Sequence, residues 1–316
     1  MVSEKDLIPV GIMTGPTATG KTALAIELAL EHGGIEIINA DSLLVYRHFN
    51  LGTAKPTREE QRGVPHHLID MRDPDSPFTA GDFVRAARDA IEEIHARGKR
   101  ALIVGGTGFY LKGLLFGVWD APAADPQIRK NLSELSSSEL HARLLEIDPV
   151  AAQRIGLHDD YRLIRALEIY QISRKTPTQL EEESKKLADP RFHLWILDRP
   201  QIELSQRIHQ RTRHMIEAGL IEEVSTLMTH FEKARALDSV GYLQVKHHLW
   251  GVLPQGRKIK EGLTGLTEEI ELATRQLVKK QRTWFRNQAQ KVSQSQLFVL
   301  DQDLPFIRDA FQKTYR

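Results

Sequence analysis

The chain has no cysteine among its 316 residues. Disulfides, a thiolate nucleophile and a cysteine-based zinc site are therefore excluded, and the composition suits a reducing compartment. The chain also lacks any apolar run approaching the ~18 residues that a transmembrane helix requires. Residues 1–6, M-V-S-E-K-D, include no apolar stretch of signal-peptide length. We therefore expect a cytoplasmic protein with no membrane span.

The sequence shows little charge imbalance and no metal-binding spacing. Lys and Arg total 43 against 42 Asp and Glu, so any basic surface must be offset by acidic residues elsewhere. The 13 histidines include the adjacent pairs His66–His67 and His247–His248, but no H-E-x-x-H sequence. Adjacent residues point to different faces of a helix or strand. We therefore interpret the histidines as structural.

A phosphate-binding loop lies near the start of the chain. Residues 15–22 read G-P-T-A-T-G-K-T and fit G-x-x-x-x-G-K-[ST]. Residues 7–13 predict a buried strand before the loop, and residues 21–30 predict a helix after it. Backbone N–H groups at such a helix start bind phosphate, Lys21 adds a positive charge, and the Thr22 hydroxyl is placed to hold Mg²⁺. The predicted diphosphate-binding residues are Gly15, Thr17, Ala18, Thr19, Gly20, Lys21 and Thr22, with Thr22 also the metal ligand.

Alternating strand and helix patterns surround this loop. Residues 35–40, 101–104 and 192–197 predict further strands, which alternate with helical patterns such as residues 83–94. The alternation predicts an α/β fold, a P-loop NTPase-like parallel sheet flanked by helices. Asp41 follows the second strand, and Thr107 lies in a second glycine-rich turn. Because carboxyl ends of parallel strands meet at one sheet edge, we expect both residues near the phosphate loop.

Strand patterns disappear between residues 120 and 189. Charged helical patterns take their place, at residues 133–145, 162–172 and 177–184. A helical stretch between two sheet strands predicts an inserted all-helical domain that can move as a lid. We therefore divide the chain into a P-loop catalytic core, residues 1–119 plus 190–316, and a helical insertion, residues 120–189.

Two groups of basic residues are candidates for binding anions. Arg207 and Arg211 lie four apart on a predicted helix, where they are either solvated surface arginines or a clamp on the diphosphate. Residues 273–291 include six basic residues and no acidic one, with Trp284 and Phe285 among them. Such a basic stripe with aromatic residues is typical of contact with a nucleic-acid backbone, the alternative being a solvated helix face. A P-loop small-molecule kinase, with Asp41 as base, would leave this stripe unexplained.

The motifs, taken together and in order, resemble those of the bacterial tRNA dimethylallyltransferases, also called tRNA isopentenyltransferases. The resemblance covers roughly residues 8 to 290. Its motifs are the phosphate loop, Asp41-Ser42, G-T-A-K-P at residues 52–56, P-H-H-L-I-D at 65–70, V-G-G-T-G-F-Y at 104–110, R-A-L-E at 165–168, R-I-H-Q-R at 207–211, V-G-Y at 240–242 and T-R-Q-L at 274–277.

The resemblance implies transfer of a dimethylallyl group from dimethylallyl diphosphate to N6 of the adenosine 3′-adjacent to the anticodon in tRNA, with Mg²⁺. The allylic carbon–oxygen bond breaks, so the phosphate loop, with Arg207 and Arg211, holds a diphosphate leaving group. Asp41 accepts the proton of the amine, and Thr107 lies at the reacting centre. The target base of the anticodon stem-loop is flipped out. The implied tRNA contacts are Asp41, Ser42, Leu43, Leu44, Arg129, Tyr161, Arg162, Arg165, Gly241, Tyr242, Lys280, Arg282 and Arg286, in a protein expected to be a monomer.

Three positions depart from the family's pattern. Leu243 stands where a basic residue is common, Asp238 precedes Ser239-Val240, and Tyr161 replaces a frequent Gln. These departures put some RNA contacts, and hence the set of modified tRNAs, in question. The alternatives are an adenylate isopentenyltransferase acting on free AMP or ATP, which does not need the basic stripe, a P-loop kinase, and a non-catalytic tRNA-binding module. The intact Lys21, Thr22 and Asp41 argue against the last.

Overall fold

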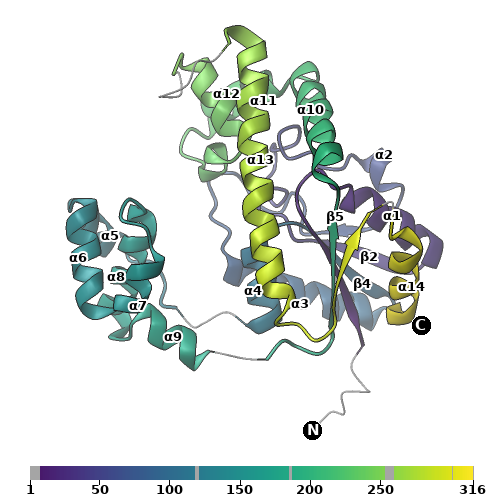
Figure 1. Ribbon diagram of the computed structural model, residues 1–316, viewed down its shortest axis with the longest axis horizontal. Helices are drawn as coiled ribbons and strands as arrows, with labels where there is room; N and C mark the ends of the chain where they lie inside the picture. Colours follow the sequence, from purple (N-terminus) through teal and green to yellow (C-terminus); the bar gives the residue numbers. More distant parts are fainter. Residues whose placement is uncertain (1–7, 118–120, 185–186, 253–259, 301, 316) are drawn as a thin grey trace. The chain divides into compact units, whose positions relative to one another are not determined.

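The computed structural model describes residues 8–117, 121–184, 187–252, 260–300 and 302–315. The chain forms two compact units (Figure 1). The core unit comprises Met1–Leu115 and Ala188–Arg316, and the helical unit comprises Phe116–Leu187. These boundaries lie two to four residues before the predicted ones, which fall at 119/120 and 189/190.

The core unit is built on a six-stranded sheet in the order β3-β2-β4-β1-β5-β6, with every neighbouring pair parallel. Its strands are β1 (Val10–Thr14), β2 (Ile35–Asn39), β3 (His66–His67), β4 (Arg100–Val104), β5 (Phe192–Asp198) and β6 (Ser295–Val299). All residues of β1 and β2 are buried, because helices cover both faces of such a sheet. The parallel α/β sheet predicted from the sequence is therefore present.

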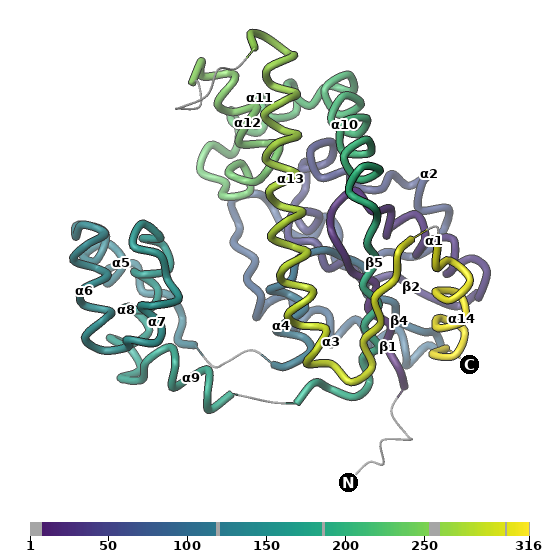
Figure 2. The backbone as a smooth tube through the Cα atoms, in the orientation of Figure 1, coloured from purple at the N-terminus to yellow at the C-terminus, as the bar shows by residue number. Residues whose placement is uncertain are grey.

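Helices connect these strands and extend beyond them. The described helices of the core unit are α1 (Lys21–His32), α2 (Arg58–Gln61), α3 (Ala80–Ala96), α4 (Gly108–Phe116), α10 (Gln201–Glu217), α11 (Leu220–His230), α12 (Tyr242–Leu249), α13 (Gly262–Ala289) and α14 (Leu304–Tyr315), with one 3₁₀ turn, η2 (Arg235–Asp238). Figure 2 shows the long helix α13 running from the layer of α11 and α12 toward β6. The predicted strand at residues 7–13 and helix at 21–30 correspond to β1 and α1.

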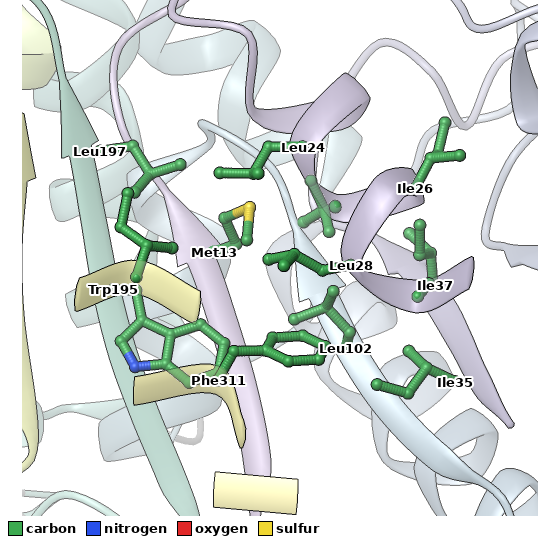
Figure 3. Close-up of a cluster of buried hydrophobic side chains, with 14 of the residues drawn as sticks. Met13, Leu24, Ile26, Leu28, Ile35, Ile37, Leu102, Trp195, Leu197 and Phe311 are labelled. Atoms are coloured by element: carbon green, nitrogen blue, oxygen red, sulfur yellow. The ribbon is translucent and has the colours of Figure 1, made fainter. Parts of the chain in front are cut away.

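One hydrophobic core lies between the sheet and helices α1 and α14 (Figure 3). Trp195 of β5 packs against Phe311 of α14, with ring centroids 5.8 Å apart. The Tyr315 hydroxyl accepts a hydrogen bond from the Gly11 amide at 2.9 Å and donates one to the Ala101 carbonyl at 2.7 Å. A Cβ at Gly11 would lie 2.6 Å from the Trp195 ring, so only glycine fits there. These contacts fix α14 against the two central strands.

A second hydrophobic core is shared by helices α10 to α13 and the loop that follows β2. Tyr242 and Phe49 are fully buried in it, with ring centroids 4.7 Å apart. Glu223 of α11 accepts hydrogen bonds from the Tyr242 hydroxyl at 2.6 Å and from the Leu51 amide at 2.9 Å. A Cβ at Gly52 would lie 2.4 Å from the Tyr242 ring. The loop that follows β2 is thereby held against α11 and α12.

The helical unit contains five helices within its described residues: α5 (Pro126–Ser133), α6 (Ser137–Ile147), α7 (Pro149–Arg154), α8 (Asp160–Ser173) and α9 (Pro177–Glu183). Its core is formed by aliphatic side chains such as Leu140, Leu144, Leu163 and Leu167. Side-chain caps start each helix, for example the Ser136–Glu139 capping box of α6. The predicted helices correspond to α6, α8 and α9, whereas α5 and α7 were not predicted.

Candidate active site

The phosphate-binding loop connects β1 to α1 at the carboxyl edge of the sheet. Gly15 has φ of 144°, and a Cβ there would lie 2.0 Å from the Leu197 carbonyl oxygen of β5, so glycine is required. Gly20, the N-cap of α1, has φ of 98° and contributes no side-chain cap. The first N–H groups of α1 are therefore not satisfied by a capping side chain, which leaves them for an anion.

Lys21 is the cation at the centre of the loop. Its Nζ donates a hydrogen bond to the Pro16 carbonyl at 2.8 Å. Burial lowers the pKa of Lys21 to about 8, an effect opposed by the negative charge of Asp41 and reinforced by the positive charge of Arg211. Asp41 therefore lies within electrostatic reach of the ammonium group, as the sequence analysis predicted. A fraction of Lys21 is neutral near physiological pH, and an incoming anion would favour its charged form.

Three arginines contact the loop from outside. Arg199 donates to the Thr19 carbonyl at 2.6 Å, and Arg207 donates to the Ala18 carbonyl at 2.8 Å. Arg211 donates to the Thr17 hydroxyl at 3.0 Å. Burial lowers the pKa of Arg211, and the Asp41 charge opposes this shift. The structure thus brings Arg207 and Arg211 to the loop, and it adds Arg199, which the sequence analysis did not identify.

Asp41 is held in a turn directly after β2. Its amide donates to the Asn39 side-chain oxygen at 2.9 Å, and its Oδ1 accepts from the Leu43 amide at 2.9 Å. The Asn39 side-chain nitrogen donates to the Asp41 carbonyl at 3.0 Å. These bonds fix the backbone and one carboxylate oxygen. The other oxygen of the same carboxylate, Oδ2, could accept a proton.

The Thr107 turn lies beside the Asp41 turn because β2 and β4 are paired. The Thr107 amide donates to the Ala40 carbonyl at 3.2 Å, and its hydroxyl accepts from the Ser42 amide at 2.9 Å. The Thr107 hydroxyl also donates to Ser42 Oγ at 3.3 Å. A Cβ at Gly105 would lie 2.2 Å from the Ala40 carbonyl carbon, so this close approach depends on glycine. Asp41, Ser42 and Thr107 are therefore neighbours.

Helix α13 crosses this edge and supplies contacts that the sequence analysis missed. Gln281 accepts a hydrogen bond from the Thr17 amide at 3.0 Å, so this amide is directed to protein rather than to a diphosphate. Arg282 donates to both carboxylate oxygens of Asp198, at the end of β5, with distances of 2.8 to 3.1 Å. It also donates to the Arg199 carbonyl at 2.7 Å. Arg282 therefore stabilises the β5–α10 connection, and its contact with tRNA stays a prediction.

Other predicted tRNA contacts differ in their accessibility. The Tyr242 side chain is fully buried, so it supports the neighbouring loop and does not offer its ring to RNA, and Gly241 is also buried. Lys280 and Arg286 of α13 are exposed, whereas Leu43 and Leu44 are half-buried. At two of the departures from the family's pattern, Leu243 is half-buried and Asp238 forms an ion pair with Lys246.

The helical unit contains a buried ion cluster. Glu168 is fully buried and accepts from Arg129 at 2.9 and 3.0 Å, from Arg165 at 2.5 Å and from the Asp125 amide at 2.7 Å. Arg165 and Arg129, both predicted to bind tRNA, therefore also organise the interior of the unit. Tyr161 and Arg162 are exposed at the start of α8, where Arg162 pairs with Asp159. The third departure, Tyr161, thus lies on the surface.

The described residues include no group of three or more His, Cys, Asp or Glu side chains that could hold a metal ion. Thr22, in the first turn of α1, offers one hydroxyl oxygen beside the loop. Mg²⁺ commonly binds through one or two protein oxygens together with substrate phosphates and water. The donor set at Thr22 therefore fits Mg²⁺ delivered with a diphosphate.

None of the described helices is long and apolar enough to cross a membrane.

Comparison with known proteins identifies the family. The model of the IPP transferase family matches residues 44–288. The chain belongs to this family. It is similar to tRNA dimethylallyltransferase 1 of Trichlorobacter lovleyi, with 42% identity over 88% of this chain and 90% of the relative. The resemblance drawn from the sequence motifs is therefore confirmed.

Solved structures agree with this placement. The full-length tRNA isopentenylpyrophosphate transferase of Bacillus halodurans is 31% identical, with a TM-score of 0.68 and coverage of 98% of both chains. A eukaryotic dimethylallyltransferase acting on tRNA is 25% identical, with a TM-score of 0.79 over 96% of this chain and 78% of that one. The expected P-loop NTPase-like fold is confirmed. Because its relatives are named tRNA dimethylallyltransferase and tRNA isopentenylpyrophosphate transferase, this IPP transferase family member is a prenyltransferase.

Proposed function

We propose that this IPP transferase family member transfers a dimethylallyl group from dimethylallyl diphosphate to N6 of the adenosine 3′-adjacent to the anticodon in tRNA. The observation that carries the proposal is the meeting of Lys21 and Asp41 at one sheet edge, close enough for the Asp41 charge to act on the Lys21 pKa. A phosphate loop beside a carboxylate suits a reaction in which a diphosphate leaves while an amine loses a proton.

The phosphate loop acts on the leaving group. As the allylic carbon–oxygen bond lengthens, negative charge grows on the diphosphate oxygens. N–H groups at the start of α1 and the charges of Lys21 and Arg211 stabilise it where it develops. Arg207 holds the loop in shape through the Ala18 carbonyl. Mg²⁺ held by the Thr22 hydroxyl and the diphosphate would neutralise further charge.

Asp41 and Thr107 act on the nucleophile. The exocyclic amine of adenine is a weak nucleophile because its lone pair is delocalised into the ring. Asp41 accepts the amine proton as the carbon–nitrogen bond forms. The Thr107 hydroxyl, held beside Ser42 at 3.3 Å, donates or accepts a hydrogen bond next to the reacting atoms. The hydrogen bonds that already hold Asp41, to the Asn39 side chain and from the Leu43 amide, reduce the reorganisation needed during the reaction.

The exposed basic residues bind the RNA. Lys280 and Arg286 of α13 neutralise phosphates of the anticodon stem-loop, and Arg162 and Tyr161 contribute from the helical unit. The core unit then serves as the catalytic domain and the helical unit as a tRNA-binding lid. The protein acts as a cytoplasmic monomer.

Mass analysis of RNA tests this function. The protein is incubated with unmodified tRNA, Mg²⁺ and dimethylallyl diphosphate, and digested RNA is searched for prenylated adenosine. Asp41→Ala should retain diphosphate binding and lose turnover by about a hundredfold or more, because the base is removed. Turnover near wild type in this variant would eliminate Asp41 as the base. Product on free AMP but not on tRNA, or ATP hydrolysis without any prenylated nucleoside, would instead support one of the two alternative enzymes.

A further inference from the structure

Helix α13 contacts several turns of the catalytic edge within four consecutive residues. Gln281 binds the phosphate loop and the Thr107 turn, and Arg282 binds Asp198 at the end of β5. Trp284 packs so closely on Gly108 that a Cβ there would lie 2.5 Å from the indole. The part of α13 that follows the exposed Lys280 is therefore fixed to the edge of the sheet where the reaction is proposed to occur.

Gln281 makes two hydrogen bonds of opposite polarity. Its Oε1 accepts from the Thr17 amide at 3.0 Å, and its Nε2 donates to the Gly106 carbonyl at 3.0 Å. A Cβ at Gly106 would lie 2.9 Å from this Nε2, so the amide lies directly against the turn. Glutamine has both a donor and an acceptor at this length, whereas glutamate lacks the donor and asparagine is one methylene shorter.

These two bonds link the two turns just beyond the paired strands. The strands are joined there by hydrogen bonds from the Gly105 amide to the Met13 carbonyl at 3.2 Å and from the Thr14 hydroxyl to the Gly105 carbonyl at 2.7 Å. A Cβ at the next residue, Gly106, would lie 3.3 Å from the Gly15 carbonyl oxygen, so the turns remain close. Beyond these hydrogen bonds the chain continues on one side into the phosphate loop and on the other toward Thr107. Gln281 bridges the two turns just past this point.

We propose that Gln281 is a positioning residue that sets the separation between the phosphate-binding loop and the Thr107 turn. The proposal rests on the proposed function, in which the first turn holds the departing diphosphate and the second lies beside the attacking amine. The allylic carbon must lie between them in line with both groups. A displacement of about 1 Å in such an arrangement costs on the order of a hundredfold in rate. Gln281 thus affects the chemical step without touching the reacting atoms.

The test separates diphosphate binding from chemistry. Gln281→Met keeps the length of the side chain and removes both hydrogen bonds. Gln312→Met is the matched control, because Gln312 is an exposed glutamine on helix α14, outside the motifs and the basic stripe. For each protein, calorimetry gives the Kd of dimethylallyl diphosphate without RNA. A single-turnover experiment with saturating dimethylallyl diphosphate and anticodon stem-loop RNA gives the rate of prenyl transfer.

We expect Gln281→Met to lose about tenfold or more in the single-turnover rate, with a Kd within about threefold of wild type. Gln312→Met should match wild type in both. A wild-type rate for Gln281→Met, or a loss that higher dimethylallyl diphosphate restores, would overturn the proposal, because Gln281 would then only stabilise the loop. If Gln281→Met does not fold, Gln281→Asn retains a polar amide and should show the same split, and a wild-type rate in it would equally overturn the proposal. Absence of prenylated adenosine with the wild-type protein would refute the proposed function itself.

Discussion

Raising the pH from about 7 to about 9 should weaken the binding of dimethylallyl diphosphate roughly tenfold, because Lys21 loses its proton in the free protein over this interval. Burial places the pKa of Lys21 at about 8, well below the ordinary value for lysine. Below this pH the free protein already has the ammonium that a diphosphate requires. Above it, a proton must be taken up before the charged contact forms, so affinity is lost as pH rises.

The size of the effect follows from the fraction of Lys21 that is protonated. With a pKa of about 8, this fraction falls from about nine tenths at pH 7 to about one tenth at pH 9. A bound diphosphate raises the pKa of Lys21, since its negative charge favours the ammonium. The loss of affinity is therefore about tenfold, or ~1.4 kcal/mol, over the two pH units. The ligand contributes little, because the second ionisation of a phosphate group lies near pH 6.

Isothermal titration calorimetry measures both the affinity and the proton uptake. Titrations of dimethylallyl diphosphate without RNA, in two buffers that differ in ionisation enthalpy, give the number of protons bound with the ligand. We expect net uptake near zero at pH 7, where release from the ligand offsets uptake by Lys21, and then about 0.5 proton at pH 8 and about 0.9 at pH 9. Lys21→Met is the control, with weaker binding that does not change over this range.

Two results would refute this reasoning. A wild-type affinity that stays constant from pH 7 to pH 9 would mean that Lys21 remains charged throughout, and hence that burial does not perturb it as the structure indicates. An identical pH profile in Lys21→Met would assign the proton to another group. Neither result would affect the assignment of the loop as the diphosphate site, which the weaker binding expected of Lys21→Met tests.

Three further predictions follow from single contacts. Glu168→Ala should lower the free energy of unfolding by about 3 kcal/mol in urea titrations, because two arginines lose their buried partner; a loss below ~1 kcal/mol would contradict this. Gly108→Ala should cost ~1–3 kcal/mol through its collision with Trp284, and an unchanged melting temperature would exclude that collision. Arg286→Ala should reduce the salt dependence of tRNA binding by about one unit of slope at constant stability, whereas Arg282→Ala should lower the melting temperature; the reverse pattern would exchange their roles.

The sequence predicted those parts of the site that depend on neighbours in the chain. The spacing of glycines, lysine and threonine in residues 15–22 defined the strand, loop and helix, because each residue acts on the backbone next to it. Asp41 and Thr107 were placed together correctly, since the carboxyl ends of adjacent parallel strands share an edge. The first of these predictions depends on local sequence alone, whereas the second follows from the general geometry of a parallel sheet, because Ser42 and Thr107 are 65 residues apart in the chain.

Two helices were missed although local signals for them exist. Helix α5 starts with Asp125-Pro126 and helix α7 with Asp148-Pro149. An Asp N-cap followed by Pro in the first turn is a helix start signal. Both helices are short, with eight and six residues, so neither gives the window of about 11 or more residues that periodicity requires. These capping signals predict the starts of α5 and α7 within residues 120–189.

The roles of the α13 side chains could not be predicted from the sequence, because their partners are distant in the chain. Arg282 is 84 residues from Asp198, and Gln281 is 264 residues from Thr17 and 175 from Gly106. A basic stripe in the sequence does not distinguish an arginine that binds RNA from one that neutralises a carboxylate at a strand end. On α13 the two situations lie four residues apart, with Arg286 exposed and Arg282 bonded to Asp198. The same helix therefore exposes positive charge and also holds together the turns of the proposed active site. The expected effect of a substitution on α13 depends on the contacts of the replaced side chain and not on its charge alone.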